Sequence, residues 1–258
     1  VSWGRVGTIV LSWVTSPVCA GILAFVLFRS VQVLILDKDD PFERAKKYIP
    51  YYMFLVGFVM AMVTFQKGLS HVGLEMSFLE ATVFSVGVGF IVVIIGMILL
   101  RNIKVDKNAD RDFHYASVEK VFAVLMIFTA CGMAFAHGSN DVANAIGPLA
   151  AVNSVIASGG VVTSQAAIPV WILALGGGGI ALGLIMYGHK VIATIGKGIT
   201  HLTPSRGFAA ELAAGTTVVI ASGTGMPIST THTLVGAVLG VGFARGIAAI
   251  NLRVIRTI

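Results

Sequence analysis

The feature that most constrains this chain is an apolar stretch long enough to cross a lipid bilayer. Residues 81–100 are twenty consecutive positions without a charged side chain, and about 20 apolar helical residues span the hydrocarbon core of a bilayer. A membrane-spanning strand needs only about 10 residues of alternating polarity, and residues 81–100 show no alternation. Similar apolar stretches recur along the chain, so the sequence predicts an all-α integral membrane protein.

The composition agrees with this prediction. Of the 258 residues, 56% are hydrophobic and 12% are charged, whereas soluble domains carry about 25% charged residues. The net charge of +6 does not indicate a nucleic-acid-binding protein, because basic residues that flank membrane spans produce the same excess. We therefore expect the lipid bilayer, and no nucleic acid, as a partner.

The polar segments between the apolar stretches predict the orientation in the membrane. Segments 37–50, 101–120 and 188–206 contain four, five and three Lys or Arg residues. The intervening segments 66–80 and 153–165 contain one and none. Because short loops rich in Lys and Arg stay in the cytoplasm, we expect the three basic segments to be cytoplasmic. The expected location is the cell membrane, crossed several times, with the bacterial inner membrane as the expected case.

The last apolar region, residues 207–243, has a different expected course. The segment GTGMP at 223–227 divides it into two pieces of about 16 residues, which are short for complete spans. Arg206 and Arg245 flank the region, so both of its ends are predicted to be cytoplasmic. This pattern favours a re-entrant hairpin of two half-helices.

Two acidic residues, Asp141 and Glu211, lie within apolar surroundings, whereas the other ten acids lie in loops or at the edges of spans. An ionisable side chain inside a bilayer is costly, so it is a functional candidate by default. We expect Glu211 to be a proton or sodium site. The alternative is that Glu211 pairs with Arg206.

Asp141 belongs to the segment AHGSNDVANAIGPL at 136–149. The Gly-Ser pair at 138–139 is expected to break the helix, so that Asn140, Asp141 and Asn144 open a new half-helix. In transporters such half-helix N-termini direct N–H groups at anionic substrates, while carboxylate and amide oxygens suit a hard cation such as Na⁺. The alternative is that these side chains only cap a kinked helix.

A second polar cluster lies in GMPISTTHTLVGAVLG at 225–240. Pro227 is preorganised to start a helix. Four polar side chains follow at the expected half-helix N-terminus: Ser229, Thr230, Thr231 and His232. Hydroxyls and exposed N–H groups there would form an uncharged anion site. The alternatives are that the hydroxyls form hydrogen bonds with neighbouring backbone groups and that His232 donates a hydrogen bond to a carbonyl oxygen.

Three segments resemble the inorganic phosphate transporter family, the sodium- or proton-coupled phosphate permeases. GSNDVANAIGPL looks like the signature of that family, and PISTTHTLVGAVLG and RGFAAEL resemble its other hallmark segments, in the same order and spacing. The resemblance implies an inverted-repeat transporter with broken helices and a re-entrant hairpin. It implies a carrier and not an enzyme, with no cofactor and with Na⁺ or H⁺ as the coupling ion.

The resemblance also implies roles for individual residues. Seven residues would line the substrate site: Asn140, Asp141, Asn144, Ser229, Thr230, Thr231 and His232. Ion coupling would depend on three residues: Asp141, Asn144 and Glu211. The expected substrate is phosphate, free or as a metal–phosphate complex. Sulfate is the runner-up, because hydroxyl groups discriminate poorly between these anions.

The family has one NDxxN and one STTH segment in each repeat, whereas this chain has one of each. We therefore expect residues 1–36 to be the tail of the first repeat, 37–120 to form two spans with cytoplasmic loops, and 121–258 to hold the motifs of the second repeat. The missing first repeat would then be a partner, and the fragment would be inactive alone. The sequence does not decide whether the protein forms a homodimer.

A rival hypothesis from another class is an intramembrane metal-dependent hydrolase. His137, Asp141 and His232 could form a ligand set for a metal such as zinc. Two points argue against it: no HExxH motif is present, and the expected helix break would separate His137 from the face of Asp141.

Overall fold

The computed structural model describes residues 3–65, 76–101, 103, 115–161, 168–193, 202–223, 226 and 228–246. Within these ranges the chain forms helices and no strands, which confirms the all-α prediction. The α-helices are α1 (Trp3–Val31), α2 (Pro41–Val63), α3 (Phe78–Leu100), α5 (Ala116–Ala157), α6 (Val170–Gly183), α7 (His189–Ala193), α8 (Pro204–Gly223) and α9 (Thr230–Arg245). Short π-helical turns extend α1 at Gln32–Leu36 and join α6 to α7 at Leu184–Gly188.

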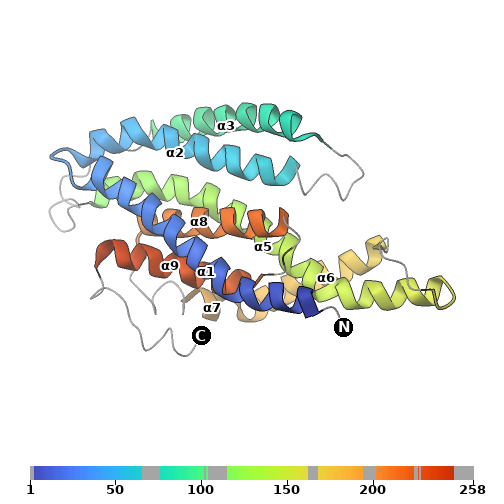
Figure 1. Ribbon diagram of the computed structural model, residues 1–258. Helices are drawn as coiled ribbons and strands as arrows, with labels where there is room; N and C mark the ends of the chain where they lie inside the picture. Colours follow the sequence, from blue (N-terminus) through green and yellow to red (C-terminus); the bar gives the residue numbers. More distant parts are fainter. Residues whose placement is uncertain are drawn as a thin grey trace.

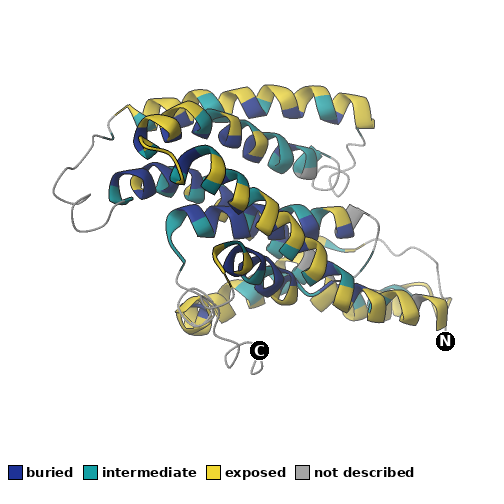
Figure 2. Ribbon diagram, turned by 60° about the vertical axis from the view of Figure 1, so that its left-hand side comes forward, coloured by how far each residue is buried: buried dark blue, intermediate teal, exposed yellow. Residues whose placement is uncertain are grey.

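Four helical stretches in the described part of the chain are long and apolar enough to cross a membrane: Val6–Leu36, Phe78–Leu100, Ala116–Gly138 and Val170–Ala193. Figure 2 shows that exposed residues cover the outer faces of the bundle, and many of these are large hydrophobic side chains on α1, α3 and α6. Soluble monomers rarely expose such extensive apolar surface. This surface is suited to lipid, and the protein is a multi-pass membrane protein.

The helices pack in successive layers (Figure 1). Helix α3 packs on α2, α2 on α5, α5 on α8, and α8 on both α1 and α9. Phe208 of α8 lies at the centre, where its ring contacts Tyr52 of α2 and Phe122 of α5 with centroid separations of 5.6 and 6.0 Å. The core therefore surrounds α8, the first helix of the predicted hairpin.

Local sequence explains where α3 begins. Ser77 accepts a hydrogen bond from the backbone N–H of Glu80, and the Glu80 carboxylate accepts one from the backbone N–H of Ser77. This reciprocal capping box satisfies two backbone donors that a helix start leaves free. The helix therefore starts three residues before the apolar stretch 81–100.

Helices α1 and α9 approach to backbone contact. A Cβ atom added to Gly240 would collide with the carbonyl group of Gly21, and one added to Gly236 would collide with that of Pro17. Small residues allow membrane helices to pack this closely. The crossing fixes α9, and therefore the second motif segment, against α1.

The two pieces of the last apolar region form a helical hairpin. Helices α8 and α9 pack on each other, and Arg206 at the start of α8 lies near enough to Arg245 at the end of α9 for their charges to repel. Both ends of the hairpin therefore lie at one end of the molecule, as predicted. The first piece was expected to be too short for a complete span, and this expectation was wrong. Helix α8 has 20 residues and extends about 30 Å, which is about the thickness of the hydrocarbon core of a bilayer. Within GTGMP, residues 224, 225 and 227 lie outside the described residues.

The predicted helix break at 138–139 is wrong. Helix α5 runs for 42 residues through Gly138 and Asp141, although Figure 1 shows that it changes direction along its course. A glycine inside a helix costs only about 1 kcal/mol relative to alanine, whereas unpaired backbone groups in lipid cost several kcal/mol each. The helix therefore continues, and Asp141 does not lie at a half-helix N-terminus.

Candidate functional site

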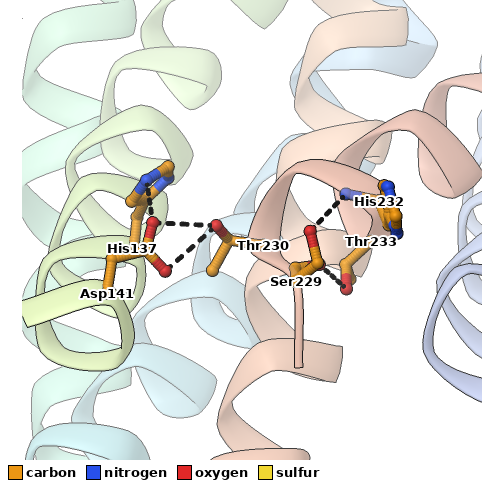
Figure 3. A network of polar contacts seen from close by, with 6 residues as sticks. All are labelled: His137, Asp141, Ser229, Thr230, His232 and Thr233. Atoms are coloured by element: carbon orange, nitrogen blue, oxygen red, sulfur yellow. Dashed lines mark hydrogen bonds and ion pairs between the residues drawn. The ribbon is translucent and has the colours of Figure 1, made fainter. Parts of the chain in front are cut away.

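The structure brings the two motif segments together at Asp141 and Thr230 (Figure 3). The Thr230 hydroxyl donates toward both carboxylate oxygens of Asp141, at 3.3 Å to Oδ1 and 3.2 Å to Oδ2. Thr230 is 2% exposed, whereas the Asp141 side chain is 34% exposed. The contact therefore joins a buried hydroxyl of α9 to a carboxylate of α5 that is still accessible.

Ser229 determines the position of Thr230, because it caps α9. Its hydroxyl accepts a hydrogen bond from the backbone N–H of His232 at 3.3 Å, and its carbonyl oxygen accepts one from the Thr233 hydroxyl at 2.8 Å. Serine at this position satisfies donors at the helix start. The alternative in which hydroxyls bond the backbone thus holds for Ser229, while Thr230 bonds a side chain instead.

His137 also contacts Asp141. Its Nε2 lies 2.7 Å from Asp141 Oδ2, and the two residues are four positions apart on one helix. The expectation that a break would separate their faces was wrong, because α5 is continuous. The Asp141 carboxylate therefore has an imidazole on one side and the Thr230 hydroxyl on the other.

Other predicted site residues do not join this contact. Asn144 lies on α5 after Asp141 and is exposed, and Thr231 is exposed at the start of α9. His232 is exposed too and lies on the other side of Thr230 from Asp141 in Figure 3. The side chain of Asn140 and the whole of Pro227 fall outside the described residues.

The ligand set of the rival hydrolase does not form. His137 and Asp141 meet, but His232 does not join them. Among the residues that the structure describes, no group of three or more His, Cys, Asp or Glu side chains could hold a metal ion.

Glu211 forms a separate polar contact inside the bundle. Its Oε2 accepts a hydrogen bond of 2.7 Å from the Thr129 hydroxyl of α5, and Thr129 is 2% exposed. Thr129 Oγ1 also lies 3.0 Å from the carbonyl oxygen of Met126. The partner of Glu211 is therefore Thr129, and the alternative pairing with Arg206 is not observed.

Glu119 is a buried acid that sequence reasoning assigned to the edge of a span. It is 9% exposed, and its neighbour Ser205 is 1% exposed. The Ser205 backbone N–H and hydroxyl donate to the Glu119 carboxylate at 2.7 and 2.8 Å. A carboxylate at a helix N-terminus is stabilised by the free N–H groups and the helix dipole. Glu119 thus fixes the start of α8 against α5.

The fold and these contacts define a class: a multi-pass helical membrane protein with polar side chains held between its apolar helices. A family model described as the phosphate transporter family matches residues 1–258. The chain belongs to the phosphate transporter family. This is a family of transporters and not of enzymes.

Individual relatives agree with this assignment. The chain is 55% identical to the "Putative phosphate permease" of Haemophilus influenzae, over all of this chain and 61% of the relative. It is 37% identical to "Inorganic phosphate transporter 2-1, chloroplastic" of Arabidopsis thaliana, over all of this chain and 47% of the relative. A solved structure described as "The sodium-dependent phosphate transporter" matches with a TM-score of 0.86 and 40% identity, over 99% of this chain and 62% of that one. The chain thus spans about three fifths of the length of the bacterial relative and of the solved structure.

Proposed function

We propose that the protein carries out secondary active transport of inorganic phosphate across a membrane, as part of a carrier of the length of its relatives. The observation that carries this proposal is the contact between Asp141 and Thr230, because it joins the two motif segments of the family. The names of the relatives support phosphate as the substrate.

The chemistry of this contact supports coupled binding. An ionised Asp141 repels a phosphate dianion, so the two cannot share a site unless a cation lies near the carboxylate. A cation at Asp141 would also take over the interaction with the Thr230 hydroxyl. That hydroxyl could then donate to a phosphate oxygen, so that cation binding favours anion binding. The sodium dependence named for the similar solved structure supports Na⁺ as the coupling ion.

Glu211 is proposed as a second coupling residue. Thr129 orients its carboxylate by a 2.7 Å hydrogen bond, and the residue lies on the hairpin that also carries Thr230. Glu211 is half-buried, and carboxylates held inside a membrane helix bundle are a common feature of ion pathways. The proposed location is a bacterial inner membrane, with the basic ends of the hairpin in the cytoplasm.

Uptake of radiolabelled phosphate into proteoliposomes that contain the natural full-length protein tests this function. An inward sodium gradient is expected to drive uptake above the level reached with a proton gradient alone, and excess sulfate is expected to compete weakly. Uptake that is independent of any cation gradient, or a preference for sulfate, would contradict the proposal.

A further inference from the structure

A groove opens between α2 and α3, where α2 begins and α3 ends. Its volume is about 570 Å³. Six of its lining residues define it: Lys46, Pro50, Ile94, Met97, Ile98 and Arg101. Further into the bundle α2 and α3 pack closely, since a Cβ atom at Gly96 would collide with Met53. Gly96 and Met53 therefore hold the two helices in close contact beside the groove.

Two cations from different helices line this groove. Lys46 extends from the first turns of α2, and Arg101 follows the last residue of α3. Lys46 Nζ lies 2.9 Å from Glu43 Oε1 and 4.4 Å from the ring centroid of Phe42. An exposed ion pair of this kind is weak, because water screens both charges, and an ammonium group has three N–H donors. Lys46 can therefore still bind an anion, together with Arg101.

The walls of the groove are apolar and exposed. Ile94, Met97 and Ile98 of α3 are 53%, 42% and 56% exposed, and they belong to a helix long enough to cross a membrane. A free hydrated anion gains nothing from such walls. An amphipathic anion places its charge at the cations and its hydrocarbon chains along α3.

We propose that this groove is a binding site for an anionic phospholipid, with its phosphate group at Lys46 and Arg101 and its acyl chains along Ile94, Met97 and Ile98. Basic pockets between membrane helices on the cytoplasmic side bind anionic headgroups, and both cations belong to segments that the distribution of Lys and Arg places in the cytoplasm. The lipid fills the space between the ends of α2 and α3. This site is independent of the contact between Asp141 and Thr230.

Native mass spectrometry of the natural full-length protein tests the proposal. The protein is released from detergent micelles that contain equal amounts of phosphatidylglycerol and phosphatidylcholine, and the lipid retained is identified by mass. The wild type is expected to retain phosphatidylglycerol preferentially. The double variant Lys46→Gln/Arg101→Gln is expected to retain it roughly 10- to 30-fold less, because each basic residue contributes about 1 kcal/mol.

The matched control is Arg44→Gln/Lys47→Gln, which removes the same charge from exposed positions on α2. This control should keep the preference for phosphatidylglycerol. Equal loss in both double variants, equal retention of the two lipids by the wild type, or displacement of phosphatidylglycerol by inorganic phosphate would each overturn the proposal. If Lys46→Gln/Arg101→Gln does not fold, Ile98→Trp is used instead, because it obstructs the groove and leaves its charges. Unchanged lipid retention in that variant would also overturn the proposal.

Discussion

Thr230 is the residue through which α9 contacts Asp141. Its hydroxyl is buried and lies 3.2 and 3.3 Å from the two carboxylate oxygens. Hydrogen bonds to a charged acceptor contribute about 1.5–3 kcal/mol when well formed, and these two are long. The contact therefore orients the carboxylate more than it stabilises the fold.

Replacing Thr230 with valine keeps the shape and removes the donor. We expect Thr230→Val to lower phosphate uptake roughly tenfold, which corresponds to about 1.4 kcal/mol, and Thr230→Ser to retain most of the uptake. The measurement is initial uptake in proteoliposomes at matched protein content. Thr8→Val is the control, because Thr8 is exposed, lies outside the proposed site and bonds a backbone carbonyl of its own helix. Equal losses in Thr230→Val and Thr8→Val would argue against a specific role for Thr230.

Glu119 is predicted to matter for stability. Glu119→Gln removes the charge from a buried group that accepts two hydrogen bonds from Ser205, so we expect a loss of about 2 kcal/mol. The check is the thermal unfolding midpoint in detergent. Glu43→Gln, an exposed residue paired with Lys46, should change the midpoint much less. An unchanged midpoint in Glu119→Gln would contradict the proposed fixation of α8.

At the residue scale, the sequence predicted the members of the central contact but not all of their partners. Asp141 and Thr230 stood out because polar groups in an apolar stretch are a local signal. Glu119 did not stand out, because it follows a polar segment and its burial depends on α8, which is distant in the sequence. The contact between His137 and Asp141 was misjudged because it requires the continuous helix.

At the scale of elements, α5 shows the limit of local reasoning. The Gly-Ser pair and the polar residues after it are typical of a broken helix, yet helical hydrogen bonding continues. No atom lies within 4 Å of a Cβ added to Gly138, so this glycine is not required by a close contact with a neighbour. The hairpin was predicted better, because interrupted hydropathy and flanking charges are both properties of the sequence.

The hairpin can be tested by cysteine labelling in intact cells. The exposed native cysteines Cys19 and Cys131 are first replaced by serine. Arg206→Cys and Arg245→Cys are then introduced singly into the full-length protein. Both should react with a membrane-impermeant maleimide only after the cytoplasmic face is opened. Labelling of the two positions from opposite sides would rule out a re-entrant hairpin.

The crossing of α1 and α9 provides a test of packing. We expect Gly240→Ala to destabilise the protein by about 1–3 kcal/mol, because the added methyl group collides with the backbone of Gly21 and overpacking costs about that much. Gly177→Ala is the control, since nothing lies within 4 Å of its added Cβ. The thermal unfolding midpoint in detergent measures both. Similar midpoints for the two variants would mean that the backbone contact is not retained.

At the scale of the whole molecule, the positions of charged residues at helix ends could be predicted from the sequence, whereas the packing order of the helices could not. Lys46, Arg101, Arg206 and Arg245 lie near the ends of apolar helices, and the packing of α8 on α9 brings the two hairpin arginines close enough for their charges to repel. The order of layers, with α8 at the centre, could not be predicted, because apolar helices of similar composition are interchangeable in a sequence. The outer helices α1, α3 and α6 keep large apolar side chains exposed, as expected for helices that face lipid.

The central claim is that Asp141 belongs to the transport site, and the most direct test is phosphate uptake by Asp141→Asn in the natural full-length protein. Asparagine keeps an oxygen that can accept the Thr230 hydrogen bond, so the fold should persist, while the loss of charge removes the cation site. Asp39→Asn, at an exposed position, controls for charge. We predict that Asp141→Asn loses most of its sodium-driven uptake at a normal membrane level, whereas Asp39→Asn does not. Near-normal uptake by Asp141→Asn would contradict the account.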